Sequence, residues 1–136
     1  IYGALEATLV SYRTGQALKE IPVLRLLSMS QAELRRRSSR FLRLMRPKLP
    51  KGARAALLEG SSVVGGGSCP DSSLSTVLVA LESDRRSPNA IEEHLRSQHP
   101  PIIVRLENDK VLVDLRTIFP SQEKLLRDRL IQALAI

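Results

Sequence analysis

Aromatic side chains are scarce in this sequence, and tryptophan is absent. The 136 residues include two phenylalanines and two tyrosines, so aromatic residues make up only 3%. Apolar residues nevertheless make up 43% and charged residues 26%, which are ordinary proportions for a globular protein. A chain of this length can bury one hydrophobic core. Leucine, valine, isoleucine and alanine must supply most of it.

Residues that bind metals or form disulfides are equally few. Cys69 is the single cysteine, so the chain can form no internal disulfide and no cysteine-based zinc site. A lone thiol favours a reducing compartment, and we expect the cytoplasm. His94 and His99 have no accompanying carboxylate cluster and are expected on the surface. Cys69 lies in no nucleophile-elbow pattern, so we predict neither a metal site nor a catalytic residue.

Long apolar runs are missing as well. No run approaches the roughly 18 residues that a membrane-spanning helix needs, so no membrane partner is expected. Glu6 lies near the start and no basic segment precedes it, which is unlike a secretory signal peptide. The first residues already show a helical pattern without an initiator methionine. We therefore expect the chain to be a piece of a longer protein.

Positive charge is abundant and concentrated in one segment. The formal net charge is +7, yet residues outside 30–51 balance thirteen basic against thirteen acidic side chains. Within 30–51 the only acidic residue is Glu33. The basic residues there are Arg35, Arg36, Arg37, Arg40, Arg43, Arg46, Lys48 and Lys51. Such a local excess is more informative about partners than a high isoelectric point alone.

Periodicity and capping residues predict an α+β fold. The expected helical segments are 1–14, a turn at 22–27, a helix opening with a Ser30–Glu33 capping box, one opening at Ser87-Pro88, and one capped by Ser121. The expected strands are 54–59, 75–82, 102–107 and 111–116, the last two joined in a hairpin at Asn108-Asp109. This order predicts a two-layer sandwich: a small, mostly antiparallel sheet with helices on one face.

Arg105 is the first candidate binding residue. Alternation along its strand places it on the face opposite Val104 and Leu106. A guanidinium held on a strand makes a rigid clamp for a carboxylate or a phosphate. Pairing with Asp114 across the hairpin is an equally good interpretation of the same pattern.

The run Gly65-Gly66-Gly67-Ser68 is the second candidate. Consecutive glycine amides can surround an anion, as they do in phosphate-binding loops. The run matches neither the Walker pattern nor the dinucleotide fingerprint. A tight bend or a bulge therefore remains the alternative interpretation.

The basic helix is the third candidate, with Arg35, Arg36, Arg37, Arg40 and Arg43 as possible nucleic-acid contacts. No aromatic side chains alternate with these arginines to stack on bases. Any contact would therefore be with backbone phosphates and independent of sequence. A solvated helix face is the alternative.

Four short segments together resemble a known family. They are Gly-Ala-Leu-Glu-Ala-Thr-Leu at 3–9, Ile-Pro-Val-Leu-Arg-Leu-Leu-Ser at 21–28, Val-Gly-Gly-Gly-Ser at 64–68, and Pro-Pro-Ile-Ile-Val-Arg-Leu-Glu at 100–107, continued by Asp-Leu-Arg-Thr at 114–117. In this order and spacing, the chain resembles the C-terminal part of bacterial selenocysteine synthases, the L-seryl-tRNA(Sec) selenium transferases.

The resemblance implies an activity and a place in a larger enzyme. Members of this family use pyridoxal 5'-phosphate and selenophosphate to convert seryl-tRNA(Sec) to selenocysteinyl-tRNA(Sec), and they assemble as homo-oligomers. The implied fold is the C-terminal small domain of an aspartate-aminotransferase-like enzyme. Residues 1–52 would then link to a missing large domain, and residues 53–136 would form the small domain.

The same resemblance implies that this chain alone is inactive. The family's cofactor lysine lies in a Ser-Gly-Asp-Lys-like context, which this sequence does not contain. Arg105 and residues 65–68 are the positions expected to approach the substrate. Two alternatives remain: a stand-alone basic RNA-binding module, and the small domain of a related pyridoxal enzyme that does not act on tRNA.

Overall fold

The computed structural model describes residues 1–64 and 73–136. They form two compact units, Ile1–Ser30 and Gln31–Ile136. Helices and one antiparallel sheet are both present, so the predicted α+β class is confirmed. The expected boundary between residues 52 and 53 refers to a large domain outside this chain, and it stays a prediction.

The first unit consists of three helices, α1 (Tyr2–Arg13), α2 (Ala17–Glu20) and α3 (Pro22–Ser28). Gly15 follows α1 with a φ of 70°, a conformation that glycine adopts without strain. The Ser11 hydroxyl of α1 donates a 2.5 Å hydrogen bond to Glu20 of α2. None of the helices in the described residues is long and apolar enough to span a bilayer.

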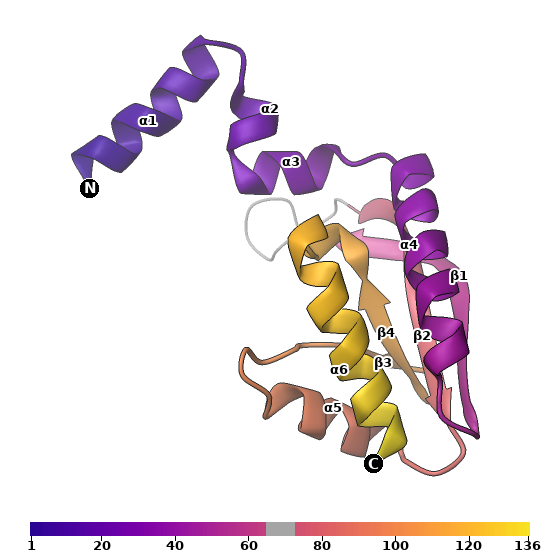
Figure 1. Ribbon diagram of the computed structural model, residues 1–136. Coiled ribbons are helices and arrows are strands. Elements are labelled where there is room, and N and C mark those ends of the chain that lie inside the picture. Colours follow the sequence, from indigo (N-terminus) through magenta and orange to yellow (C-terminus); the bar gives the residue numbers. More distant parts are fainter. Residues whose placement is uncertain (65–72) are drawn as a thin grey trace. The chain divides into compact units, whose positions relative to one another are not determined.

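The second unit contains the sheet and three helices. Its elements are α4 (Gln31–Met45), β1 (Ala53–Val63), β2 (Ser73–Ser83), α5 (Pro88–Arg96), β3 (Arg105–Glu107), β4 (Lys110–Asp114) and α6 (Glu123–Ala135), with 3₁₀ turns at Arg46–Lys48, Leu115–Thr117 and Pro120–Gln122. The strand order is β1-β2-β4-β3, and every neighbouring pair is antiparallel (Figure 1).

The predicted hairpin is confirmed, although its first strand is shorter than expected. Asn108 and Asp109 have φ values of 50° and 57°, as a two-residue hairpin turn of the primed type requires. Pairing begins only at Arg105, so residues 102–104 were wrongly assigned to a strand. Ile102 and Val104 pack against the core without pairing, which explains their apolar pattern.

Two other element boundaries also differ from the sequence expectation. Residues 115 and 116 form a 3₁₀ turn because the Asp114 carboxylate accepts the Arg116 backbone N–H at 2.9 Å. Ser121 lies inside another 3₁₀ turn, so it is not the cap of α6, which begins at Glu123. By contrast, Ser87 caps α5 as predicted, its hydroxyl accepting the Ala90 N–H at 3.2 Å.

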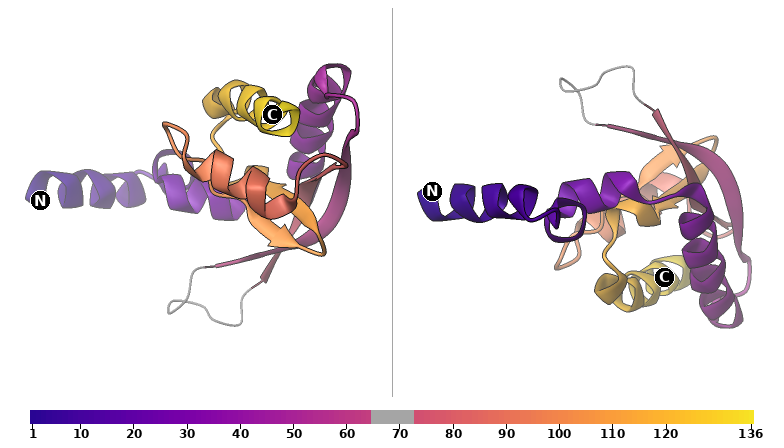
Figure 2. Two further views of the ribbon diagram at one scale, coloured as in Figure 1. Left: turned by 90° about the horizontal axis from the view of Figure 1, so that it is seen from below. Right: turned by 90° about the horizontal axis from the view of Figure 1, so that it is seen from above.

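One face of the sheet carries the main core. Helices α4, α5 and α6 cover this face (Figures 1 and 2), and α6 lies against both α4 and α5. The fully buried side chains of the cluster are mostly aliphatic, as the scarcity of aromatic residues requires. They include Phe41, Met45, Leu81, Ile91, Leu95, Val111, Leu115 and Leu130.

The opposite face of the sheet, here called the open face, has a smaller apolar cluster of Leu78, Ala80 and Leu112. Gly60 of β1 lies beside this cluster. A Cβ atom added to Gly60 would lie 2.7 Å from the Leu78 Cδ1 atom. The Leu78 side chain therefore occupies the space that a side chain at position 60 would need.

Substituting Gly60→Ala tests this packing. We expect the variant to be destabilised by up to about 1 kcal/mol, because the new methyl group forces the end of the Leu78 side chain to shift. In a Leu78→Ala background the same change should cost nothing, since the opposing atoms are gone. Urea unfolding of the four proteins in a double-mutant cycle measures this coupling. An equal cost in both backgrounds would contradict the account.

Candidate functional site

Arg105 projects from β3 onto the open face of the sheet. Its Nη1 donates a 3.2 Å hydrogen bond to the Ser61 carbonyl of β1, although β4 and β2 lie between these strands in the sheet. Its Nε is 3.8 Å from the Glu107 carboxylate. The side chain thus extends over the small apolar cluster and stays 44% exposed. A guanidinium so placed keeps donors available to a ligand.

Two hollows flank this arginine. One has a volume of about 290 Å³ and includes Leu58, Gly60, Asn108 and Lys110 in its lining. The other has a volume of about 280 Å³ and includes Val63, Ile103, Asp114 and Thr117. Arg105, Leu78 and Leu112 line both. The open face therefore offers a cationic group above an apolar floor, with space on either side.

Asp114 forms its hydrogen bonds with residues other than Arg105. Its carboxylate accepts the Thr76 hydroxyl at 2.9 Å, the Arg116 N–H at 2.9 Å and the Ser62 hydroxyl. These bonds join β1, β2 and β4 at one end of the open face. No ion pair between Arg105 and Asp114 occurs in the described residues. The cross-hairpin alternative for Arg105 is therefore not the arrangement observed.

A row of ion pairs links neighbouring strands at the other end of the open face. Lys110 of β4 donates a hydrogen bond to Glu82 of β2, and Arg54 of β1 lies 3.6 Å from Glu82 and 2.8 Å from Asp84. The hydrogen bond from Lys110 is the main cause that lowers the pKa of Glu82. Hydrogen bonding to Asp84 raises the pKa of Arg54. Glu82 is therefore a carboxylate at neutral pH.

A Lys110→Met substitution should raise the pKa of Glu82, because it removes the main group that favours the carboxylate. A lowered carboxyl pKa contributes stability above the unfolded-state pKa, and this contribution is lost as the pH falls through the folded-state pKa. Carbon-13 NMR of the Glu82 carboxyl during an acid titration measures the midpoint. An unchanged midpoint in the variant would contradict the assignment.

The exposed side of α4 forms a separate basic surface. Arg35, Arg36, Arg40 and Arg43, with the small residues Ala32 and Ser39, line a hollow of about 590 Å³. We call these four arginines the basic face. Arg35 pairs with Glu59, but both side chains are more than half exposed, at 52% and 67%. Such a surface pair contributes little and leaves Arg35 able to change partner.

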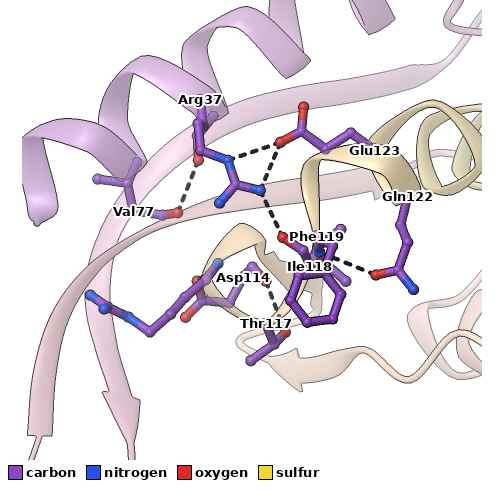
Figure 3. A network of polar contacts seen from close by, with 10 residues as sticks. Arg37, Val77, Asp114, Thr117, Ile118, Phe119, Gln122 and Glu123 are labelled. Atoms are coloured by element: carbon purple, nitrogen blue, oxygen red, sulfur yellow. Dashed lines mark hydrogen bonds and ion pairs between the residues drawn. The ribbon is translucent and has the colours of Figure 1, made fainter. Parts of the chain in front are cut away.

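Arg37 differs from the four arginines of the basic face. Its side chain is only 15% exposed and faces α6 (Figure 3). Nε donates to the Glu123 carboxylate at 2.9 Å, and Nη2 donates to the Ile118 carbonyl at 2.7 Å. Arg37 thereby fastens α4 to the start of α6. Helical spacing already contained the signal, since Arg37 lies three residues after the buried Leu34 and four before the buried Phe41.

An Arg37→Gln substitution should destabilise the second unit by about 2 kcal/mol, because Glu123 would lose a charged partner in a half-buried position. Arg36→Gln, one position away on the exposed side, should change stability by less than about 0.5 kcal/mol. Chemical denaturation of both variants checks the difference. Equal stability of the two would show that the Arg37 contacts are not needed.

The glycine-rich run, the cysteine and the histidines are the remaining candidates from the sequence. Gly65, Gly66, Gly67 and Ser68 lie outside the described residues, as does Cys69. His94 lies on α5, close to the Gln98 side chain. Within 1–64 and 73–136, no group of three or more potential ligands could hold a metal ion. Sequence reasoning missed the Asp114 cluster, because its members come from three strands that only pairing brings together.

Comparison with known families settles where the chain belongs. The model of the L-seryl-tRNA selenium transferase family matches residues 1–119. The chain belongs to this family. The match includes α4, the whole sheet and Arg105. The resemblance recognised in the four short segments is thus confirmed.

Individual relatives agree with the family assignment. The L-seryl-tRNA(Sec) selenium transferase of Geobacter sulfurreducens is 43% identical over 116 residues, covering 85% of this chain and 25% of the relative. Those of Carboxydothermus hydrogenoformans and Desulfotalea psychrophila are 36% and 38% identical, covering 88% and 95% of this chain and 25% and 28% of the relatives. The chain spans about a quarter of the length of the curated relatives it matches.

Proposed function

We propose that this chain is the C-terminal domain of an enzyme that converts seryl-tRNA(Sec) to selenocysteinyl-tRNA(Sec) with selenophosphate. The observation that carries the proposal is the family match over residues 1–119, supported by 43% identity to a relative named for this reaction. The small antiparallel sheet with helices on one face agrees with the expected small domain of an aspartate-aminotransferase-like enzyme.

The described residues do not fit a covalent site for pyridoxal 5'-phosphate. That cofactor requires a lysine within a pocket, where an aldehyde can condense with the amine. Lys110 is bonded to Glu82, and the other lysines, Lys19, Lys48, Lys51 and Lys124, are exposed. The cofactor of the parent enzyme would therefore be held by residues outside this chain, and the isolated chain should be inactive.

Arg105 is the residue through which this domain would contact the substrate. The seryl group is attached as an ester and has no free carboxylate for the guanidinium to bind. The tRNA acceptor end instead carries phosphate groups, which suit a guanidinium with free donors. We propose that Arg105 holds the acceptor end over the open face, and that Gly65, Gly66, Gly67 and Ser68 contribute to the same substrate site.

Two further properties of the parent enzyme follow from this proposal. Its substrate would be an aminoacylated tRNA, so the enzyme would work in the cytoplasm, where Cys69 of this chain would stay reduced. The parent would assemble as a homo-oligomer, as the family resemblance implies. The basic face of α4 also favours a second candidate function, a module that binds RNA without taking part in the reaction.

An Arg105→Gln substitution in the intact enzyme tests the proposed role. We expect kcat/KM for seryl-tRNA(Sec) to fall about ten- to hundredfold, which corresponds to one charged hydrogen bond. Arg96→Gln on α5, behind the opposite face of the sheet, is the matched control and should have little effect. Formation of selenocysteinyl-tRNA from purified seryl-tRNA and selenophosphate provides the assay.

The same assay tests the proposed function itself. If the intact wild-type protein forms no selenocysteinyl-tRNA, the enzymatic proposal is wrong. If the wild type is active and Arg105→Gln matches the Arg96→Gln control, only the assignment of Arg105 is wrong.

A further inference from the structure

We propose that the basic face of α4 binds the sugar-phosphate backbone of the tRNA, at a site separate from Arg105. The inference rests on the proposed function, because the choice of RNA as the polyanion comes from the relatives' substrate. Its position and chemistry come from the structure. Four exposed arginines, Arg35, Arg36, Arg40 and Arg43, share one side of a single helix.

The shape of this surface suits a chain of phosphates. The residues that line the hollow include no carboxylate. The short side chains of Ala32 and Ser39 leave space between the arginines. From Arg35 to Arg43 the helix rises by about 12 Å at 1.5 Å per residue. The four arginines are thus spread along the helix, so each can contact a different phosphate of an RNA strand.

Burial supports the same conclusion. The apolar side of α4 is covered, with Leu34, Phe41 and Met45 at most 1% exposed. Because this side is unavailable, α4 cannot insert into a lipid surface as an amphipathic helix would. No aromatic residue lines the hollow to stack on a base or to anchor a protein partner. The interaction that remains is contact with phosphates, which does not depend on the nucleotide sequence.

The position of the basic face separates it from the candidate substrate residue. Helix α4 packs on the helical side of the sheet, whereas Arg105 projects from the open face. The basic face and Arg105 therefore lie on opposite sides of the sheet, and we expect them to contact different parts of the tRNA. Substitutions on α4 should therefore change tRNA affinity and its salt dependence, and leave the chemical step unchanged.

The test uses the intact protein and a fourfold variant, Arg35→Gln, Arg36→Gln, Arg40→Gln and Arg43→Gln. The dissociation constant for seryl-tRNA(Sec) is measured across salt concentrations. Loss of four phosphate contacts should lower the slope of log affinity against log salt by about three and weaken binding at least about tenfold at low salt. At saturating tRNA, kcat should be unchanged. Each single variant should lower the slope by somewhat less than one.

A control of equal charge separates this site from general electrostatic attraction. Four exposed positions outside α4 supply this control, which removes the same number of charges: Arg13→Gln, Arg25→Gln, Arg85→Gln and Lys124→Gln. The slope of this control should stay near that of the wild type. Melting curves and circular dichroism confirm that both variants are folded, as expected for changes at exposed positions.

The outcomes are distinguishable. Equal loss in the two fourfold variants, or no loss in either, overturns the α4 site while leaving the proposed activity intact. If neither fourfold variant loses affinity, an acidic protein surface becomes the better candidate partner for the basic face. If the wild-type protein neither binds seryl-tRNA nor converts it, both this inference and the proposed function fail.

Discussion

Burial of one sheet face beneath α4, α5 and α6 is the constraint on which the rest of the second unit depends. Successive side chains of β2 and β4 point to opposite faces of the sheet. Those on the helical side, Val79, Leu81, Val111 and Val113, enter a common aliphatic core. With so few aromatic residues, this core relies on many well-fitted aliphatic contacts. Because one face is fixed in this way, the register of every strand is fixed too, and the opposite face is left for polar and charged groups.

That division gives the two candidate binding surfaces their different characters. On the open face, cross-strand partners hold one another: Asp114 collects donors from three strands, and Glu82 lies between Arg54 and Lys110. Arg105 is left with one carbonyl partner and a distant carboxylate. On the helical side, α4 hides its apolar stripe and turns four arginines outward. The two contacts that we propose, one through Arg105 and one through the basic face, therefore lie on opposite sides of the sheet.

Much of the fold could be predicted from local rules. The Asn108-Asp109 turn, the Ser87 cap and the amphipathic pattern of α4 each depend on residues close together in the sequence. The errors lie where tertiary contacts replace local ones. Ile102 and Val104 have the alternation of a strand but gain burial without pairing, and the Asp114 side chain turns residues 115–117 into a 3₁₀ turn. The basic segment was visible, but the different role of Arg37 was not recognised.

The sequence alone determined the class of fold, the family and the concentration of positive charge, because periodicity, short ordered motifs and composition are properties of neighbouring residues. Only the tertiary structure decided how the charged residues divide their roles. Helical spacing places Arg37 near the buried side of α4, but its partners Ile118 and Glu123 lie 81 and 86 residues further along the chain, so only folding brings them to it. Likewise, Asp114 accepts the hydroxyls of Ser62 and Thr76 only because strand pairing brings β1 and β2 beside β4.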